Sequence, residues 1–396
     1  MEKFKRIITI VLDSVGIGEA PDAEMFGDEG ADTLGHLCAY WENNLAVPNL
    51  SQLGLGRINR PEPLVGITSS SQLPSFVGKM QEISAGKDSM DGHWEMMGVA
   101  VRTPLNMFPD GFPQLLISKI EKFSNRKVIL NRAYSGTQAI YDYGEQQLAE
   151  GSLIVYTSGD SVLQIAANEA VVPVDELYRI CRFVRITVDS SQWHIGRIIA
   201  RPFVGQTSTN FQRTSNRRDY SMSPLRKTVL DQLVEHNVNV YGIGKINDIF
   251  SCRGISEQIH TMNNDDAVNQ ILHVMEHTST GFVFANLVDF DSNYGHRRDP
   301  EGYGNELARV DQRVGEVLAC LQSSDLLIIT ADHGNDPTFR GHDHTREYVP
   351  LIVYAACLSG GNLGIRPTFS DLGATILENF DIKAETGGQS FLGELK

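Results

Sequence analysis

Aspartate and histidine residues recur together in the C-terminal third of the sequence. Asp291 is followed by His296, and Asp332 is followed directly by His333. Carboxylate oxygens and imidazole nitrogens are donors that Zn²⁺, Mn²⁺, Fe²⁺ and Ni²⁺ use in proteins. Asp13 near the N-terminus and His344 add two further candidates, which gives six ligands that could divide into two sets of three. The candidate metal ligands are Asp13, Asp291, His296, Asp332, His333 and His344.

A simpler interpretation is that these are ordinary loop residues. An aspartate after a strand often stabilises a turn, and a single Asp-His pair is common on protein surfaces. That interpretation does not explain histidines on three separate predicted loops. The joint arrangement therefore favours a metal centre.

Two metal ions roughly 3.5–4 Å apart can stabilise the attacking and leaving oxygens of an in-line displacement, and such chemistry also needs a nucleophile. The polar, glycine-containing segment 86–95 supplies Ser89, whose hydroxyl would become more acidic on metal coordination. Lys87 could balance phosphate charge. A serine in such a loop is usually a turn residue, and it becomes a candidate nucleophile only beside the metal ligands.

Apolar, β-branched runs predict the strands that must position these residues. Helical patterns lie between several of them, for example over residues 304–321. Alternating strands and helices predict an α/β fold with a mostly parallel sheet and helices on both faces. The predicted strands are Ile7–Leu12, Leu153–Thr157, Val238–Gly244, Phe282–Val288, Leu326–Thr330 and Leu351–Ala355.

Three of these predicted strands lead into candidate ligands. The first strand ends at Asp13, the fourth leads into the segment that holds Asp291, and the fifth leads into Asp332. Ligands of open α/β sheets bind beyond the carboxyl ends of the strands. We therefore expect the acidic residues to meet at one edge of the sheet.

The length of 396 residues suggests more than one domain. The proline- and glycine-containing stretch 108–113 and the basic stretch 210–218 differ in composition from the flanking sequence. We predict a smaller α/β domain over residues 102–220, inserted into a core domain made of residues 1–101 and 221–396.

Composition narrows the class of protein. The chain has 34 basic and 49 acidic residues, a net charge of −15 that argues against a nucleic-acid partner. Five dispersed cysteines without CxxC spacing favour a reducing compartment. The N-terminal apolar run is too short for a signal peptide, and no stretch approaches the roughly 18 apolar residues of a membrane span. These features predict a cytoplasmic enzyme without a membrane partner.

The sequence resembles the phosphopentomutase family of the alkaline phosphatase superfamily along essentially its whole length. The metal motifs are shared across the superfamily, whereas the segments beginning at Asp13, Gly295 and Asp343 are more specific to this family. The matching segments are LDSVGIGEAPDA, GKDSMDGHWE, YTSGDSVLQIAA, IARPFVG, NLVDFDSNYGHRRDP, TADHGNDP and DHTREYVPL.

The resemblance implies an alkaline phosphatase-like core and roles for individual residues. One metal ion, with Mn²⁺ as the family's usual metal, would be held by Asp13, Asp332 and His333 and would touch Ser89. The second would be held by Asp291, His296 and His344.

The sequence departs from the family pattern at four positions. Ser89 stands where the family usually has a phosphorylated threonine, and the loss of the methyl group removes restriction on the side-chain rotamer. Asp91 replaces a small or neutral residue, which adds negative charge near the nucleophile. Arg218 replaces an expected histidine, and His342 is an additional imidazole that we interpret as a bystander.

The inserted domain resembles the family's cap, which helps to recognise the sugar phosphate. By position, Asp160 matches a residue that faces the substrate, and Arg201 matches one expected near phosphate. Arg213 and Arg217 are weaker phosphate candidates, since a solvated basic loop explains them equally well.

The resemblance implies interconversion of α-D-ribose 1-phosphate and D-ribose 5-phosphate, and of the 2-deoxyribose pair, through a phosphoserine and a bisphosphate. Glucose 1,6-bisphosphate or a similar sugar bisphosphate would act as activator. The alternatives are a metal-dependent phosphatase or a cofactor-independent phosphoglycerate mutase of the same superfamily, and a non-catalytic metal-binding protein.

Overall fold

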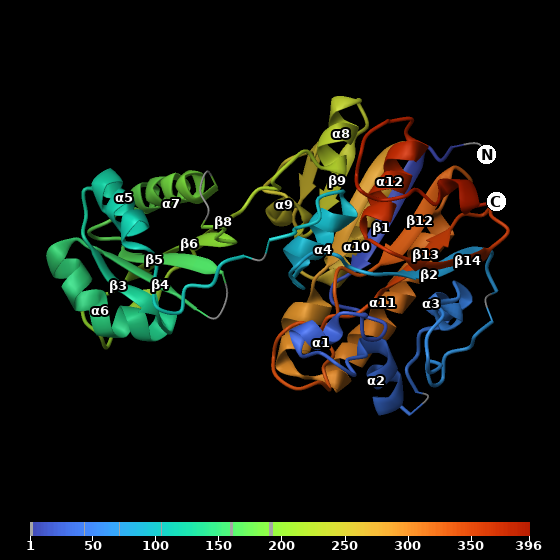
Figure 1. Ribbon diagram of the computed structural model, residues 1–396, viewed down its shortest axis with the longest axis horizontal. Coiled ribbons are helices and arrows are strands. Elements are labelled where there is room, and N and C mark those ends of the chain that lie inside the picture. The colour runs from blue at the N-terminus through green and yellow to red at the C-terminus, as the bar shows by residue number, and fades with distance from the viewer. Residues whose placement is uncertain (1–2, 43, 71, 104, 159–160, 190–192) are drawn as a thin grey trace. The chain divides into compact units, whose positions relative to one another are not determined.

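The structure is a computed structural model that describes residues 3–42, 44–70, 72–103, 105–158, 161–189 and 193–396. The chain forms two compact units (Figure 1). The core unit contains residues 1–103 and 224–396, and the inserted unit contains residues 104–223.

The core unit is built on an eight-stranded sheet with the strand order β10-β9-β11-β1-β12-β13-β2-β14. Its central strands are fully buried, because helices cover both faces. The strands are β1 Arg6–Leu12, β2 Ser75–Met80, β9 Val240–Ile243, β10 Glu257–Ile259, β11 Gly281–Leu287, β12 Asp325–Thr330, β13 Val349–Tyr354 and β14 Gly361–Arg366.

The helices of the core unit form two layers. Helices α4, α8, α9 and α12 pack together in one layer, and α2, α3, α10 and α11 pack in the other. None of the helices in the described residues is both long and apolar enough to cross a membrane. The helices are α1 Ala23–Phe26, α2 Thr33–Tyr40, α3 Pro48–Gln52, α4 Ser89–Met96, α8 Val229–Glu235, α9 Ile246–Ile249, α10 Asn264–His277, α11 Pro300–Cys320 and α12 Ser370–Asn379, with short helical turns η1 Leu55–Arg57, η2 Phe290–Tyr294, η3 Gly295–Arg297 and η4 Leu392–Glu394.

The α/β fold with a mostly parallel sheet is confirmed, but one strand of the core sheet runs the other way. Strand β13, predicted as parallel, pairs antiparallel with both β12 and β2. No helix of the described residues separates β12 from β13, so the chain returns without the crossover that a parallel pair requires. Its burial resembles that of a parallel strand because helices cover the sheet whatever the strand direction.

The inserted unit has its own sheet, in the order β3-β4-β5-β6-β7, with β8 also paired to β6. Strand β4 is parallel to β3 but antiparallel to β5, so its prediction as one of a parallel set is only partly correct. The elements are β3 Val128–Ala133, β4 Leu153–Thr157, β5 Val162–Asn168, β6 Arg197–Val204, β7 Gln212–Arg213, β8 Arg218–Ser221, α5 Gln114–Ser124, α6 Gly136–Glu150 and α7 Val174–Asp189.

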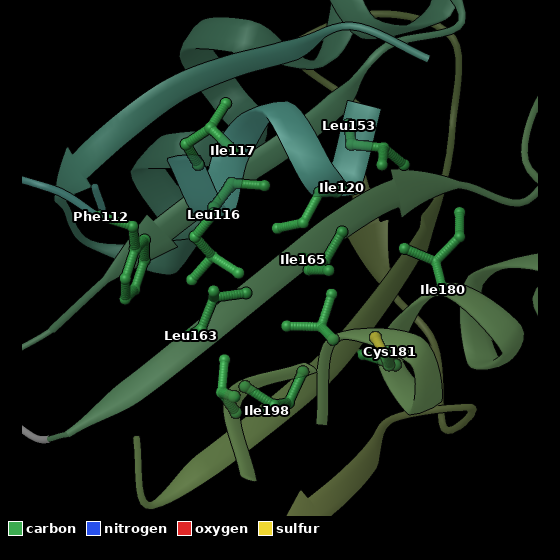
Figure 2. Close-up of a cluster of buried hydrophobic side chains, with 14 of the residues drawn as sticks. Phe112, Leu116, Ile117, Ile120, Leu153, Leu163, Ile165, Ile180, Cys181 and Ile198 are labelled. Carbon is green, nitrogen blue, oxygen red and sulfur yellow. The ribbon is translucent and has the colours of Figure 1, made fainter. Parts of the chain in front are cut away.

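A hydrophobic core joins α5 and α7 to one face of this sheet. Leu116 and Ile120 of α5 point towards Leu163 and Ile165 of β5 (Figure 2), and all four side chains are fully buried. Helix α6 packs against the same sheet with a second buried cluster that includes Ile140. The inserted unit therefore has a core of its own, as an independent folding unit requires.

Two neighbouring leucines of α5 provide a stability test for the inserted unit. Leu116→Ala should lower the free energy of unfolding by about 2–5 kcal/mol, because it removes buried methyl groups and leaves a cavity. Leu115→Ala is the matched control, since that side chain is 64% exposed. Urea unfolding followed by circular dichroism measures both. Equal effects of the two substitutions would contradict the packing described here.

Candidate metal centre and nucleophile

Parallel strand pairing brings the carboxyl ends of three strands to one edge of the core sheet. Strand β1 lies between β11 and β12, with Leu12 opposite Leu287 and Val11 opposite Thr330. Asp13 follows directly after β1, Asp332 lies two residues beyond the end of β12, and Asp291 lies in the η2 turn after β11. The predicted meeting of these acidic residues at one sheet edge is what the structure shows.

One group of candidate ligands consists of Asp13, Asp332 and His333. One ligand atom from each residue lies within 4.8 Å of the others, and all three side chains are buried. The His333 Nε2 atom lies 3.5 Å from Asp13 Oδ1 and 3.4 Å from Asp332 Oδ2. These three residues are the set expected to hold the metal ion nearest Ser89.

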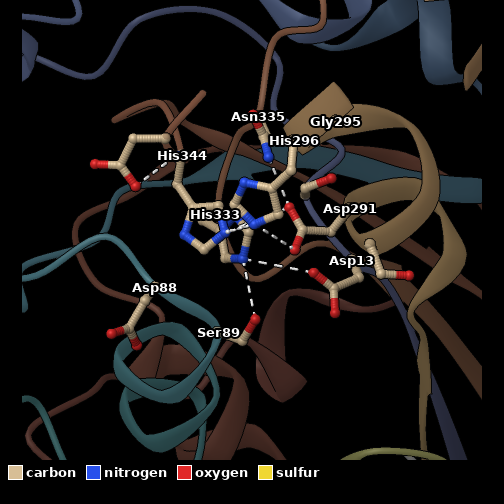
Figure 3. Close-up of polar contacts among 12 residues, drawn as sticks. Asp13, Asp88, Ser89, Asp291, Gly295, His296, His333, Asn335 and His344 are labelled. Atoms are coloured by element: carbon tan, nitrogen blue, oxygen red, sulfur yellow. Dashed lines mark hydrogen bonds and ion pairs between the residues drawn. The ribbon is translucent and has the colours of Figure 1, made fainter. Parts of the chain in front are cut away.

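The second group surrounds Asp291 (Figure 3). Its carboxylate lies 3.2 Å from His296 Nε2 and 3.3 Å from His344 Nε2, and the two Nε2 atoms are 3.1 Å apart. His333 also falls within ligand distance of Asp291 and His344. All six predicted ligands therefore lie in one continuous cluster, in which His333 is adjacent to both groups.

The three histidines share an orientation that suits metal binding. Each directs Nε2 into the cluster and places Nδ1 near a backbone carbonyl oxygen, at 2.7 Å for His296, 3.1 Å for His333 and 3.1 Å for His344. A carbonyl oxygen only accepts, so Nδ1 donates, and in the neutral ring Nε2 keeps its lone pair. Metal-bound histidines usually have their second nitrogen held in this way.

Unpaired carboxylate oxygens provide an independent test of whether cations fit here. Both oxygens of Asp13 and Oδ2 of Asp332 are buried without a hydrogen-bond partner among the described residues. Buried polar atoms are normally satisfied, and an unmet carboxylate oxygen is costly. The donors present, carboxylates and imidazole Nε2 atoms, fit divalent cations.

The electrostatics lead to the same conclusion. Burial, followed by the charge of Asp332, raises the pKa of Asp13 to about 8. Burial has the opposite effect on His333 and lowers its pKa, but the nearby carboxylates of Asp332 and Asp13 more than offset it and raise the pKa overall. Burial alone would raise the pKa of Asp332, but the charges of His333 and His93 lower it overall, so the repulsion between the two carboxylates falls on Asp13. A bound cation would favour the ionised form of Asp13.

Ser89 is held against this cluster by the start of α4. The Asp88 side chain accepts hydrogen bonds from the backbone N–H groups of Met90 and Asp91, at 2.9 Å and 3.1 Å, and so fixes the helix to begin at Ser89. The Ser89 hydroxyl lies 3.2 Å from His333 Nε2. A Cβ atom on Gly92 would lie 2.1 Å from the Asp332 carbonyl oxygen, so only glycine allows α4 to approach this closely.

Two residues near Ser89 were not identified from the sequence. Lys245 donates to the Ser89 hydroxyl at 3.2 Å and lies 3.9 Å from Asp13. His93 Nδ1 lies 2.7 Å from the Ser89 carbonyl oxygen and 3.2 Å from Asp332, and Asn286 contacts its Nε2 at 3.0 Å. Lys245 follows the end of strand β9, but a basic residue there does not fit the pattern of acidic strand ends that predicted the metal ligands. His93 lies inside a buried helix and gave no comparable signal.

Asp91 is buried beside the helix start rather than exposed to solvent. Burial, followed by the charge of Asp88, raises the pKa of Asp91 well above its ordinary value. Its carboxyl group therefore takes up a proton more readily than an ordinary aspartate. The negative charge expected near Ser89 from the sequence is correspondingly reduced.

The predicted residues of the inserted unit fall on and beside its sheet. Arg201, in β6, donates a hydrogen bond to the Gln164 side chain at 3.0 Å. Burial, followed by the charge of Arg217, lowers the pKa of Arg201. Arg217 is paired with Asp219 at 2.8 Å. Asp160 lies outside the described residues.

The other two basic positions of the inserted unit have different surroundings. Arg213 lies beside the first residue of α6, where a Cβ atom on Gly136 would be 2.2 Å from its guanidinium and 2.5 Å from the Tyr156 hydroxyl. Arg218 lies over the rings of Tyr178 and Tyr220, at 5.3 Å and 5.6 Å from their centroids. The glycine therefore makes room for Arg213 against the start of α6.

Comparison with known proteins gives matches over the whole chain. Residues 5–384 match the family described as the metalloenzyme superfamily. A curated protein of Levilactobacillus brevis named phosphopentomutase is 55% identical over 395 residues, which cover 100% of both chains. A phosphopentomutase of Limosilactobacillus reuteri is 53% identical over 99% of both chains. The structure of the PH0037 protein from Pyrococcus horikoshii has a similar fold, with a TM-score of 0.50 and 13% sequence identity. The match covers 97% of this chain and 99% of the PH0037 chain.

Proposed function

The chain belongs to the phosphopentomutase family, and from that premise we propose that it interconverts α-D-ribose 1-phosphate and D-ribose 5-phosphate, and the corresponding 2-deoxyribose phosphates. It is an isomerase that acts by intramolecular phosphotransfer, a pentose phosphate mutase. The finer proposal concerns how its own residues carry out the transfer.

The observation that carries this mechanism is the position of the Ser89 hydroxyl. It lies at the start of α4, 3.2 Å from both His333 Nε2 and Lys245 Nζ, beside three buried carboxylate oxygens of Asp13 and Asp332 that lack hydrogen-bond partners among the described residues. A purely structural metal site has no need of a serine hydroxyl held among its ligands. The arrangement supports Ser89 as the group that accepts and returns the phosphoryl group.

The donors fit two divalent cations, which we take to be Mn²⁺ by family resemblance, one held by Asp13, Asp332 and His333 and one by Asp291, His296 and His344. When bound, such ions supply positive charge to phosphoryl oxygens and lower the pKa of a serine hydroxyl. Lys245 donates a hydrogen bond to the Ser89 oxygen and so places a positive charge beside it.

In the proposed cycle, phosphorylated Ser89 transfers its phosphoryl group to the free hydroxyl of the sugar monophosphate. The bond between phosphorus and the Ser89 oxygen breaks, a bond to the sugar oxygen forms, and a sugar bisphosphate results. The phosphate at the other sugar position then returns to Ser89. The proton lost by one sugar hydroxyl is regained by the other, so the net reaction is an isomerisation. A sugar bisphosphate such as glucose 1,6-bisphosphate would phosphorylate Ser89 initially.

We propose that the inserted unit recognises the sugar phosphate. The positively charged groups of Arg201, Arg213 and Arg217 lie close enough to influence one another and the buried Tyr156 hydroxyl. Guanidinium groups bind phosphate oxygens in bidentate geometry. Arg201 is the most buried of the three arginines, so an anion bound there would face less competition from water.

Mass spectrometry after incubation with glucose 1,6-bisphosphate and Mn²⁺, followed by an assay with ribose 1-phosphate, tests this function. We expect one phosphoryl adduct on Ser89 and production of ribose 5-phosphate. Release of inorganic phosphate in its place would indicate a phosphatase, and turnover of 3-phosphoglycerate would indicate a phosphoglycerate mutase. Metal binding without an adduct would indicate a non-catalytic protein.

Arg201→Ala tests whether the inserted unit orients the substrate. The substitution leaves the metal ligands and Ser89 in place, but misplacement of a substrate by about 1 Å can cost on the order of 100-fold in rate. We therefore expect a large loss of mutase activity with unchanged metal content, and more hydrolysis of the phosphoenzyme relative to transfer. Production of ribose 5-phosphate and of inorganic phosphate measures both.

Arg179→Ala is the matched control for this change in charge. Arg179 is exposed on α7, with its guanidinium 5.3 Å from the centre of the Phe123 ring. It should keep full mutase activity. If Arg201→Ala kept full activity, or lost its metal ions, Arg201 would have no part in substrate recognition as proposed.

A further inference from the structure

A second group of potential metal ligands lies on α10, among residues that take no part in the proposed phosphoryl transfer. His273, Glu276 and His277 are exposed, and one ligand atom from each lies within 4.8 Å of the others. Residues three and four positions apart lie on the same face of a helix. The two imidazole centroids are accordingly 4.1 Å apart. One helical turn therefore presents two nitrogen donors and one carboxylate.

The hydrogen bonding of His277 leaves a nitrogen available to a metal ion. Its Nδ1 lies 2.8 Å from the carbonyl oxygen of His273. Since that oxygen only accepts, Nδ1 carries the proton in the neutral ring and Nε2 keeps its lone pair. The same arrangement holds the three histidines of the metal centre.

The end of α10 is fixed rather than frayed. The buried guanidinium of Arg6 donates to the carbonyl oxygens of Met275, at 2.7 Å, and Thr278. Helix C-termini also carry partial negative charge, which favours a bound cation. A fixed backbone keeps the three donors close together before any ion binds, which lowers the entropic cost of binding.

We propose that His273, Glu276 and His277 form a surface site for a divalent transition-metal ion of the Zn²⁺ or Ni²⁺ type. Two imidazole nitrogens with one carboxylate suit these ions, and ions of this type bind nitrogen-containing sites more tightly than Mn²⁺. The site leaves coordination positions open to water because all three residues are exposed. Binding there stabilises the folded state, since the unfolded chain does not hold the three donors together.

Retention of the untagged, Mn²⁺-loaded enzyme on immobilised Ni²⁺ tests the site directly. Wild type should be retained, and His273→Ala and His277→Ala should each elute at clearly lower imidazole concentration. Calorimetric titration of the Mn²⁺-loaded enzyme with Zn²⁺ should show, besides replacement of Mn²⁺ at the metal centre, one further site per chain that weakens at least 10-fold in either variant. Loss of a direct ligand should cost no less than loss of the group that hydrogen-bonds to a ligand. Mutase activity should be unchanged in both variants.

His236→Ala is the matched control. His236 is exposed at the end of α8, and its Nδ1 lies 2.8 Å from the Gln232 carbonyl oxygen, but the residue one turn earlier is a glutamine rather than a histidine. This variant should bind Ni²⁺ and Zn²⁺ as wild type does. Equal loss of retention in His236→Ala, or no difference between wild type and the His273→Ala/His277→Ala double variant, would overturn the proposal.

Discussion

Ser89→Ala should abolish the interconversion of ribose 1-phosphate and ribose 5-phosphate while leaving the fold and the metal content intact. Alanine offers no oxygen to accept the phosphoryl group, and loss of a covalent nucleophile lowers turnover by roughly four to six orders of magnitude. The side chain is 7% exposed and small, so its removal leaves little cavity. Activity, metal content and mass spectrometry after incubation with glucose 1,6-bisphosphate measure the three consequences.

The threonine variant tests whether a hydroxyl group at position 89 is sufficient for activity, or whether the serine side chain itself is required. Ser89→Thr keeps an oxygen at the same position, adds a methyl group that restricts the rotamer, and should remain active and form the phosphoenzyme. Mutase activity that persists in Ser89→Ala would rule out the covalent mechanism. An active alanine variant whose phosphoryl adduct moves to another residue would identify a different nucleophile.

The strands that are buried on both faces are those whose sequence is most informative. Apolar, β-branched runs predicted β1 and β12 to within one residue and β4 without error, because strands buried on both faces show no polar alternation. The same signal carries no information about direction. Strand β13 was therefore predicted as parallel, although it pairs antiparallel with both neighbours.

The candidate site was also only partly predictable from the sequence. Asp13 and Asp332 could be placed together because each lies within two residues of the end of a predicted strand, and parallel register then fixes their neighbourhood. Lys245 reaches Ser89 from a third strand end, β9, but a single lysine after a strand has no distinctive spacing. His93 contacts the Ser89 carbonyl oxygen within its own helix, but its contact with Asp332 depends on the approach of α4 that Gly92 allows. Such tertiary contacts are not visible in sequence order.

Asp332→Ala and His344→Ala should each lower bound metal towards one ion per chain and reduce mutase activity by orders of magnitude. Each variant lacks one of the three protein ligands proposed for one ion, and a single ion cannot act on both oxygens of the transfer. Metal content by mass spectrometry and turnover of ribose 1-phosphate measure the effect.

His342→Ala is the control that makes this prediction specific. His342 is exposed, its backbone carbonyl oxygen accepts from His296 Nδ1 at 2.7 Å, and its own Nδ1 lies 3.2 Å from the His296 carbonyl oxygen. Alanine keeps that carbonyl, so His296 should keep its orientation, and both metal ions and activity should be retained. Loss of metal in His342→Ala equal to that in His344→Ala would show that the second site uses a different histidine. Full metal content in Asp332→Ala would show that the orphaned carboxylate oxygens beside Ser89 do not hold an ion.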